Sequence, residues 1–583
     1  MLACQRSPTG PESDSVGVHN DASGLQAASA SEIRLPLETG ISSLDPAAAN
    51  DAVSQRVSGQ IFDTLLDWDP AASPPRLIAE LSELPELDAR GLTLTFHLRQ
   101  GDAARRFAPD ICLKGQDPQT KGRALRPSDA AMSILRHADP KLAGAWDLLA
   151  GRILGLDDWR STSPESRSPM PAGIVADDRA GTLTLQLTRT QPELPAILAN
   201  PRLAIVPPEC VAYYNGDDDL HPPFARHPVG SGPYRLDHAL SELPRAAVLI
   251  ANPVAPRTAM PMPADGVLSC TTQPGIGRVI LEHYASSEAA LRLFQAGTIA
   301  AFAPGQGVFE EVIRDGTLIP GQTPEDTVIR RASVLATTLL VFHMTDPILG
   351  QSEDPVIDAE HRRERQAIAA AFDDRRYHRI IRNGAWAEPA SQVTPRDLLN
   401  PGPGVALHPS AAADRTRPPA RLSPQKTLRY MTTTGPAAQQ EAAILREALR
   451  PIGYVLEVTY DDSYLYKLLS GQASAQLFSL RFDADYPDPA SFLDPFTCGS
   501  SGSYSGFCSP RYDAVHSRFA RAKPGPERDA LALDLERILG AEVPVRPIDT
   551  PELWLLTRGW LKNVIRHPLS GLRIELLCVD HGA

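Results

Sequence analysis

The chain has 583 residues, of which 42% are hydrophobic, and a formal net charge of −13. This length is enough for two to four domains with a large buried core. The acidic balance argues against a nucleic-acid partner, because nucleic-acid binding depends on a basic surface, and no apolar run approaches the roughly 18 to 20 residues that span a bilayer.

The first thirty residues are predicted to be a signal remnant and a flexible tether. Cys4 follows Leu2 and Ala3, which is the small-residue context of a lipoprotein cleavage site. Residues 5–30 are rich in Ser, Ala, Gly and Asp and have little to bury. We expect Cys4 to carry a lipid, with translation beginning upstream of Met1 or the chain trimmed; an ordinary N-terminal cysteine is the alternative.

In the body of the chain, strands and helices are predicted from the period of the apolar residues. Residues 31–37 read as a strand, and residues 52–69 as a helix because Val53, Val57, Ile61 and Leu65 recur every four positions. Residues 91–101 and 181–192 alternate apolar and polar side chains, so we expect two half-buried strands of one sheet. Helices are expected between them near 127–138 and 140–150.

Further along, residues 278–284 are predicted to be a strand that leads into a helix. Ser286 or Ser287 suits its N-cap and Gly297 its C-terminal end, and a strand is expected at 298–302. From 426 to 482, strand, helix, strand, helix and strand follow one another through short loops, which predicts a parallel sheet flanked by helices. The segments are 426–434, 439–453, 454–460, 463–472 and 475–482.

The acid-rich stretch DADYPDPASFLDPF, residues 483–496, begins where the last of these strands ends. Ligands of open parallel sheets lie beyond the carboxyl ends of the strands, so Asp483 and Asp485 are expected at a binding cleft. By the same rule the loop after the first strand places Gly40 and Ile41 where their backbone groups could meet a ligand.

Enzymatic and metal-binding interpretations of this stretch have little support. A glycosidase pair of carboxylates fits poorly with a chain that is only 6% aromatic. Pro487, Pro489 and the lack of an EF-hand glycine disfavour calcium. No HExxH, GxSxG or GxxxxGK[ST] motif and no CxxC occurs. We predict no catalytic residue, metal or cofactor, and keep a carboxylate-dependent hydrolase as the alternative.

The cysteines predict one disulfide and leave the rest open. Cys498 and Cys508 bracket the short flexible loop GSSGSYSGF, which can close as a disulfide in an oxidising compartment. The sequence does not determine the pairing of Cys112, Cys210, Cys270 and Cys578.

Taken in order, several segments resemble the extracytoplasmic solute-binding proteins of peptide ABC transporters, the oligopeptide- and dipeptide-binding class known as solute-binding protein family 5. The resemblance covers most of residues 31–583. The segments are SSLDP at 42, QIFDTLLDWDP at 60, GLTLTFHLRQG at 91, RPSDAAMSILRHADP at 126, HPVGSGPYRL at 227, RERQAIAAAFD at 363, the acid-rich stretch and SPRYDAV at 509. In HPVGSGPYRL we expect Gly230 and Gly232 to supply tight-turn geometry before a strand.

The resemblance implies an α/β, two-lobed periplasmic-binding-protein fold of type II, with an extra subdomain and a ligand cleft between the lobes. Lobe I would comprise residues 31–75, 200–335 and a return segment, 545–583. Residues 76–199 would form the extra subdomain, and residues 336–544 lobe II.

The resemblance also implies roles for residues of the acid-rich stretch. Asp485, within Ala484-Asp485-Tyr486, corresponds to the aspartate that pairs with the α-ammonium of a bound peptide, and Tyr486 shares its motif. The family usually carries tryptophan three residues before that aspartate; this chain has Phe482, which keeps a stacking face but loses an indole N–H. Asp483, Asp488 and Asp494 are expected to cap loops or to be solvated.

The function implied is that of a non-enzymatic, monomeric, periplasmic or extracytoplasmic binder that captures a peptide or peptide-like solute and delivers it to the permease of an ABC importer. The departure at Phe482 leaves a metal chelate, haem or sugar open as the solute. A transcriptional regulator that uses this fold as a sensor is a further class.

Overall fold

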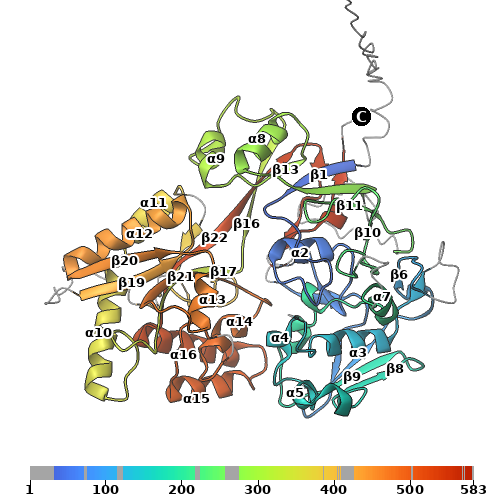
Figure 1. The fold of residues 1–583 in the computed structure, drawn as a ribbon, viewed down its shortest axis with the longest axis horizontal. Helices are drawn as coiled ribbons and strands as arrows, with labels where there is room; N and C mark the ends of the chain where they lie inside the picture. The colour runs from blue at the N-terminus through green and yellow to red at the C-terminus, as the bar shows by residue number, and fades with distance from the viewer. Residues whose placement is uncertain are drawn as a thin grey trace, which may run out of the picture.

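The structure is a computed structural model in which two halves, each built on its own sheets, are joined by long strands (Figure 1). It describes residues 32–70, 72, 75–113, 122–142, 144–216, 223–255, 275–384, 387–402, 405, 407–408, 426–500, 503–567, 569 and 571–580. Cys4, Cys270 and the predicted tether over residues 1–30 lie outside the described residues.

The first sheet brings residues 32–37 next to residues 234–283. Its strands are β1 (Glu32–Leu37), β10 (Tyr234–Leu236), β11 (Ala246–Ala251) and β12 (Arg278–His283). The order is β1-β12-β11-β10, with β1 parallel to β12 and the other neighbours antiparallel. The strand predicted at 31–37 is thereby confirmed, and it buries Ile33, Leu35 and Leu37 on one face.

The helix predicted over residues 52–69 is wrong in its length. Helix α2 covers only Ala52–Ser58 and ends at Gly59. Ile61 and Leu65 are fully buried, as their spacing implied, but they lie beyond the helix on the way to β2 (Leu66–Trp68), which pairs with β3 (Leu77–Ala79).

Contacts with a distant segment explain why α2 stops there. Gln60 O and Ile61 O accept hydrogen bonds from Tyr234 N–H (3.0 Å) and Gly232 N–H (2.8 Å). A Cβ on Gly230 would lie 2.0 Å from Ile61 O, and one on Gly232 would lie 2.7 Å from Ile61 C. Neither glycine has a positive φ, so the predicted turn geometry is not what requires them. They lack a Cβ because two backbones approach closely here.

A second sheet, β4-β5-β9-β8, contains the two alternating strands that were predicted to share a sheet. Its strands are β4 (Glu86–Leu87), β5 (Thr93–His97), β8 (Ile174–Asp177) and β9 (Thr182–Gln186). β5 and β9 are antiparallel neighbours, which confirms the prediction, and Leu94 and Phe96 are buried while His97 is exposed.

Short elements connect these strands. The helix predicted near 127–138 is confirmed as α3 (Pro127–Arg136), whereas the one predicted near 140–150 is a single turn, α4 (Trp146–Leu149), because Gly144 and Gly151 flank it. The others are β6 (Arg106–Phe107), β7 (Arg123–Ala124), α5 (Leu156–Ser161), α6 (Leu194–Ile197) and α7 (Pro208–Tyr214).

The largest sheet has the order β13-β22-β17-β21-β19-β20, with β16 and β18 also paired to β22. Its strands are β13 (Ala301–Phe302), β16 (Thr327–Ser333), β17 (Ala336–Phe342), β18 (Ala387–Pro389), β19 (Lys426–Thr432), β20 (Tyr454–Tyr460), β21 (Leu477–Asp483) and β22 (Val545–Arg558). β19 is parallel to β20 and β21, linked by α12 (Pro436–Leu449) and α13 (Tyr464–Leu469), so the predicted parallel unit is confirmed. β17 and β22 extend it with antiparallel pairing.

Helix α8 (Ser287–Gln295) begins and ends as predicted. Ser286 Oγ accepts from Ala289 N–H at the N-cap, and Gly297 follows with a φ of 76°. The strand expected at 298–302 contracts to β13. The remaining elements are α9 (Gln306–Val312), β14 (Ile313–Arg314), β15 (Thr317–Leu318), α10 (Pro355–Ala371), α11 (Asp374–Ile381), α14 (Pro489–Leu493), α15 (Pro510–Phe519), α16 (Pro526–Glu542), β23 (Leu561–Lys562), β24 (Arg566–His567), β25 (Gly571–Leu572) and β26 (Cys578–Val579).

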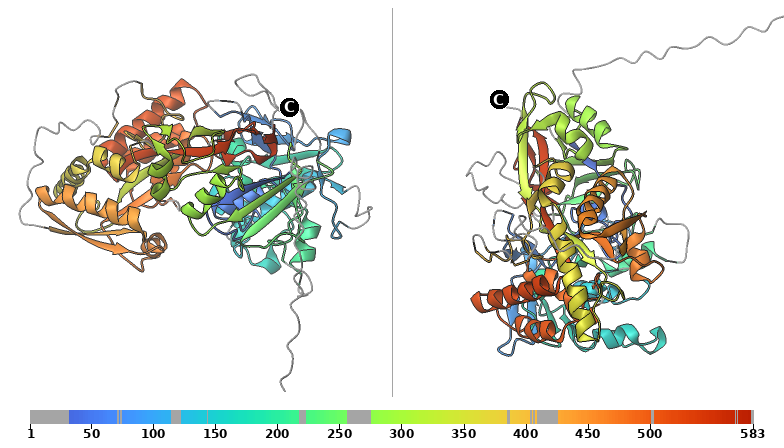
Figure 2. Two further views of the ribbon diagram at one scale, coloured as in Figure 1. Left: turned by 90° about the horizontal axis from the view of Figure 1, so that it is seen from above. Right: turned by 90° about the vertical axis from the view of Figure 1, so that its left-hand side faces the viewer.

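The halves are joined where β16 continues into β17 and where β22 changes partner. β22 pairs with β17 through residues 545–549 and with β16 through residues 552–558. Seen from above (Figure 2, left), the orange strands β19 and β20 lie at the end of the molecule far from the blue strands of the first half. The chain therefore crosses between the halves at Val334–Leu335 and Thr550–Pro551. The first half consists of the described residues up to Val334 and from Pro551 onward, and the second half of those between the two crossings.

Candidate functional site

Three of the four aspartates in residues 483–496 have partners within their own half. Asp483 ends β21 and is exposed, Asp488 caps α14 by accepting from Ala490 N–H, and Asp494 lies at the end of that helix. The ion-pair partners are Arg481 for Asp483 (2.7 Å), Arg528 for Asp488 (2.8 Å) and His516 for Asp494 (2.7 Å). Asp488 caps a helix and Asp483 is exposed, as expected for these residues, whereas the three ion pairs were not predicted.

Asp485 instead faces the other half of the molecule. Its backbone N–H donates to Ser491 Oγ (2.9 Å), and its carbonyl accepts from Asn200 Nδ2 (2.8 Å). Its carboxylate lies 3.7 Å from Arg202 Nη1, and its side chain is 41% exposed. A carboxylate is thus placed at the boundary between the halves, where it is still accessible to solvent.

The charges around Asp485 favour a further cation. Burial raises the pKa of Asp485 to about 6, the charges of Asp147 and Asp483 also raise it, and Arg202 opposes them. Arg202 is engaged elsewhere, since its guanidinium donates to Asp147 Oδ1 (2.9 Å) and Gly144 O (2.8 Å). One guanidinium is therefore shared between two carboxylates, which leaves an excess of negative charge.

An apolar cavity is lined by Leu480 and Phe482 of β21 and by Tyr504. It has a volume of about 20 Å³, room for about one water molecule. Phe482 lines it and packs edge-on against Phe492 (5.3 Å between centroids) and Tyr504 (6.0 Å). The charge of Asp485 contributes, after burial, to raising the pKa of Tyr504. The structure therefore brings Phe482 and Tyr504 into contact, and Tyr504 lies within the electrostatic influence of Asp485.

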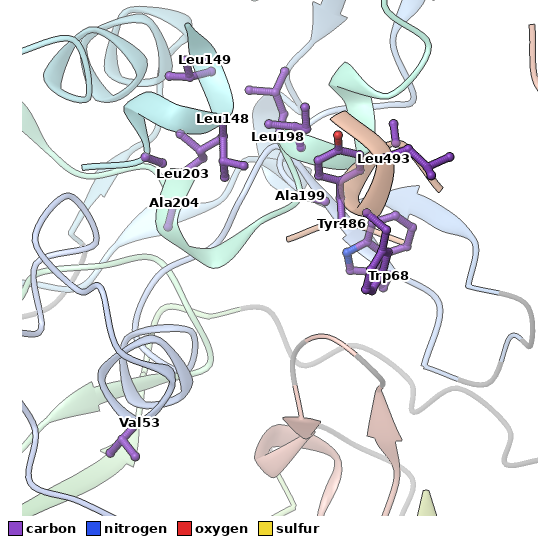
Figure 3. Close-up of a cluster of buried hydrophobic side chains, with 14 of the residues drawn as sticks. Val53, Trp68, Leu148, Leu149, Leu198, Ala199, Leu203, Ala204, Tyr486 and Leu493 are labelled. Atoms are coloured by element: carbon purple, nitrogen blue, oxygen red, sulfur yellow. The ribbon is translucent and has the colours of Figure 1, made fainter. Parts of the chain in front are cut away.

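Tyr486, predicted from its motif to contact ligand, is a core residue. It is 3% exposed, and Figure 3 shows its ring among Leu198, Ala199 and Leu493. Burial, followed by the charge of Asp494, holds its pKa well above the usual value. Tyr486 offers no surface to a ligand in this conformation, and its ring instead anchors the acid-rich stretch against the other half.

Gly40 and Ile41 follow β1 as predicted, but their contacts are local. Ile41 N–H donates to Pro244 O (2.8 Å), and the Ile41 side chain is 3% exposed. Gly40 lies against the same proline. Among the described residues, no hydrogen bond or ion pair joins either one to Asp485, and the Ile41 N–H already has an acceptor.

Several residues of the site were missed from the sequence. Asn200, Arg202 and Asp147 surround Asp485 from the other half, and Arg152 forms a second contact there, 3.5 Å from Asp494. They lie in short turns about 280 to 340 positions earlier in the chain, as the separation of 285 between Asn200 and Asp485 illustrates. No local motif marks them.

The predicted disulfide between Cys498 and Cys508 is confirmed. A second joins Cys112 to Cys210, a pairing that the sequence left open, and Cys578 is also disulfide-bonded.

Within the part of the chain that the structure describes, no three His, Cys, Asp or Glu side chains are grouped so that they could hold a metal ion. In the same residues, none of the helices combines the length and the apolar character needed to cross a membrane.

Comparison with known proteins agrees with the resemblance seen in the sequence. The sequence model described as "Bacterial extracellular solute-binding proteins, family 5 Middle" matches residues 75–504. The chain is 27% identical over 100 residues to the dipeptide-binding protein DppE of Bacillus subtilis, which is 17% of this chain and 18% of that protein. It is 25% identical over 227 residues to the glutathione-binding protein GsiB of Salmonella paratyphi A, which is 38% of this chain and 35% of that one.

Solved structures extend the similarity to the whole fold. The periplasmic binding protein DppA from Helicobacter pylori, in complex with the peptide STSA, superposes with a TM-score of 0.69 at 18% identity, covering 94% of this chain and 98% of that one. At that identity the comparison shows the fold and nothing finer. The predicted α/β, two-lobed fold of periplasmic binding proteins is confirmed.

Proposed function

The chain belongs to the bacterial extracellular solute-binding proteins of family 5, and on this premise we propose that it captures a peptide or peptide-like solute outside the cytoplasm and delivers it to the permease of an ABC importer. The matched stretches cover only 18% and 35% of the curated relatives' length, so solute and partner are part of the proposal. A dipeptide, glutathione and a tetrapeptide are named for three similar proteins, which favours a peptide.

The single observation that carries the proposal is the position of Asp485. Its carboxylate is 41% exposed at the boundary between the halves, in surroundings with excess negative charge. A carboxylate and an ammonium about 4 Å apart attract by roughly 4 kcal/mol at an effective dielectric constant near 20. Asp485 would therefore hold the α-ammonium of a peptide, with main-chain hydrogen bonds accounting for tolerance of different side chains.

Phe482 and Tyr504 would receive the first side chain of the peptide. Their rings border an apolar cavity that has the volume of about one water molecule. A bulky side chain would require these rings to move apart. Gly40 and Ile41 remain predicted contacts of the peptide main chain.

We propose a domain organisation that the two halves of the structure support. We assign residues 31–75, 200–335 and 545–583 to lobe I, residues 76–199 to its extra subdomain and residues 336–544 to lobe II, although residues 545–549 at the start of the return segment still pair with β17 of lobe II. The crossings at Val334–Leu335 and Thr550–Pro551 would act as the hinge, and a ligand would favour the closed population of lobes.

Calorimetry with matched aspartate variants tests the role of Asp485. Asp485→Asn is expected to weaken the affinity for a free-amine tripeptide by more than about tenfold, or about 1.4 kcal/mol. The N-acetylated tripeptide, which lacks the ammonium, should bind both proteins equally. Asp534→Asn is the control, because Asp534 is exposed (55%) and paired with Arg537 on its own helix. Equal affinity of the wild type and Asp485→Asn for the free amine would remove Asp485 from the site.

The identity of the solute, the absence of turnover and the lipid anchor need separate measurements. Mass spectrometry of the molecule that copurifies with the protein would identify the solute, and recovery of a tripeptide at unchanged mass is expected after incubation. Cleavage of the tripeptide would favour a hydrolase instead.

The lipid anchor is tested separately. Labelled fatty acid should be incorporated at Cys4, and this incorporation should be lost in Cys4→Ser. The binder is expected to be a monomer.

A further inference from the structure

The loop that the disulfide between Cys498 and Cys508 closes supplies part of the wall of the apolar cavity described above. Tyr504 and Ser505 of this loop line the cavity together with Phe482 of β21. The Tyr504 ring packs edge-on against Phe482, with 6.0 Å between the ring centroids. The size of the cavity therefore depends on where the loop holds Tyr504.

Tyr504 also lies within reach of the charged groups at the boundary between the halves. Burial raises its pKa, the charges of Asp485 and Asp147 raise it further, and the charge of Arg202 lowers it. Such effects weaken with distance, so the ring lies in the neighbourhood of the Asp485 carboxylate. In a peptide, the carbon atom that carries the α-ammonium also carries the first side chain. A peptide whose ammonium meets Asp485 would therefore present its first side chain near Tyr504.

Both ends of the loop are fixed to neighbouring segments, although its described residues form neither helix nor strand. Cys498 N–H donates to Oδ1 of Asp513, a residue of α15 (3.1 Å). Cys508 exchanges two hydrogen bonds with Gln351, since its N–H donates to Oε1 (3.0 Å) and its carbonyl accepts from Nε2 (2.8 Å). The disulfide thus joins two points that are each held in place.

The residues next to Tyr504 in the loop are anchored as well. Ser505 O accepts a hydrogen bond from Met344 N–H (2.7 Å), and the Ser505 side chain is buried. Phe507 is 1% exposed, and its ring packs edge-on against Tyr512 (5.8 Å between centroids). Because these anchors lie one and three positions beyond Tyr504, the ring has little freedom to move away from the cavity.

The cavity that results is small. Its volume of about 20 Å³ is room for about one water molecule, which is comparable to a methyl group. The side chains of glycine, alanine and serine suit a space of this order, whereas a benzyl group would have to push Tyr504 and Phe482 apart. Overpacking is unfavourable where the surroundings cannot yield, and a cross-linked loop yields less because the cross-link restricts its conformations.

We propose that the disulfide-closed loop, residues 498–508, makes the peptide site selective for peptides with a small first side chain, by holding Tyr504 against Phe482. This inference rests on the proposed function and names the class of peptide that the site prefers. The two cysteines act through Tyr504 and touch no ligand themselves, so they are positioning residues.

Calorimetry of the full chain with the free-amine tripeptides Ala-Ala-Ala and Phe-Ala-Ala tests the proposal. The wild type should bind the alanine-first peptide at least about tenfold more tightly. In the double variant Cys498→Ser, Cys508→Ser this ratio should fall to about threefold or less, because the loop can then open locally and admit the larger group. The double variant Cys112→Ser, Cys210→Ser is the matched control, since it removes a disulfide far from the cavity wall and should keep the wild-type ratio.

The outcomes separate this inference from the proposed function. A wild-type ratio near one or below it, an unchanged ratio in the Cys498 and Cys508 variant, or an equal fall in the control would overturn the selectivity of the loop, while peptide binding itself would stand. Failure of the wild type to bind either tripeptide would contradict the proposed function, and this inference with it. If circular dichroism shows that the Cys498 and Cys508 variant does not fold, Tyr504→Ala decides with both disulfides intact. It should lose the discrimination in the same way, and an unchanged ratio would overturn the proposal.

Discussion

At the scale of single residues, Asp485 differs from the three aspartates near it because, among the described residues, its carboxylate has an ion-pair partner only in the opposite half. Asp483, Asp488 and Asp494 each have a cation in their own half. Asp485 meets Arg202 at 3.7 Å, and that guanidinium is already bonded to Asp147. A ligand ammonium would therefore complete an ion pair that the unliganded protein satisfies only partly.

The first prediction at this scale concerns pH. Since the pKa of Asp485 is raised to about 6, and the α-ammonium of a peptide loses its proton with a pKa of about 7.7 to 8.0, affinity for a free-amine tripeptide should be greatest near pH 7. It should fall as the pH drops through 6, by up to about tenfold per unit, because the carboxyl must lose its proton to hold the ammonium. Calorimetry between pH 5 and 8 measures this. A flat profile, or one matched by the N-acetylated peptide, would contradict it.

The second prediction concerns Arg202. Its charge lowers the pKa of Asp485, so Arg202→Gln should move the midpoint of the pH dependence upward. The measurement is the same titration series, with Arg179→Gln as a control at an exposed position. A midpoint that stays in place, or moves to lower pH, would show that Arg202 does not act on the carboxyl.

At the scale of elements, disulfides close two loops of very different length. Cys112 and Cys210 are 98 positions apart, whereas Cys498 and Cys508 are 10 apart. The first loop runs from the β6–β7 hairpin to α7. It therefore includes β8 and β9 of the second sheet but not β4 and β5. The second closes a short loop just after the acid-rich stretch.

A third prediction compares these two loops. The chain-entropy model assigns about 4.7 kcal/mol to a loop of about 100 residues and about 2.7 kcal/mol to one of about 10. Replacing Cys112 and Cys210 by serine should therefore lower the urea midpoint of unfolding more than replacing Cys498 and Cys508. The opposite order, measured under oxidising conditions, would show that native contacts rather than loop entropy dominate.

At the scale of the whole molecule, the two halves meet both through the crossing strands and through side chains. β16, β17 and β22 carry the chain across, and Figure 1 shows β22 running between the halves. Away from these strands, Asn200 and Arg202 reach Asp485, and Arg152 reaches Asp494. Movement about the crossings would change these contacts directly.

The fourth prediction is that ligand closes the lobes. Small-angle scattering should show a smaller radius of gyration for the full chain when a tight-binding tripeptide is added, because the closed population makes the additional ligand contacts. Asp485→Asn, at a peptide concentration below its weakened dissociation constant, should keep the value of the unliganded protein. If the radius of gyration of the wild-type protein were identical with and without bound tripeptide, hinge closure would be contradicted.

Local patterns in the sequence determined much of the fold and the place of one charge. Some features depend only on neighbouring residues and can therefore be predicted without knowing the rest of the fold. Examples are the alternation in residues 91–101, the cap at Ser286 and the succession of strands and helices after residue 426. The order of motifs identified the family. The position of Asp485 just beyond β21 follows from the same reasoning, because strand ends in parallel sheets share an edge.

Only the tertiary structure decided where α2 ends, that Tyr486 is buried, and that Asn200, Arg202 and Asp147 surround Asp485. Gly59 by itself does not require a helix to end. The close approach of Gly230 and Gly232 to Ile61 holds the residues after Gly59 in a non-helical conformation. Tyr486 and Asp485 are adjacent, yet one packs into the core and the other lies at the boundary between the halves with a partly exposed side chain. These outcomes depend on contacts between segments that are hundreds of positions apart in the sequence. The free energies of such contacts cannot be deduced from a local sequence pattern.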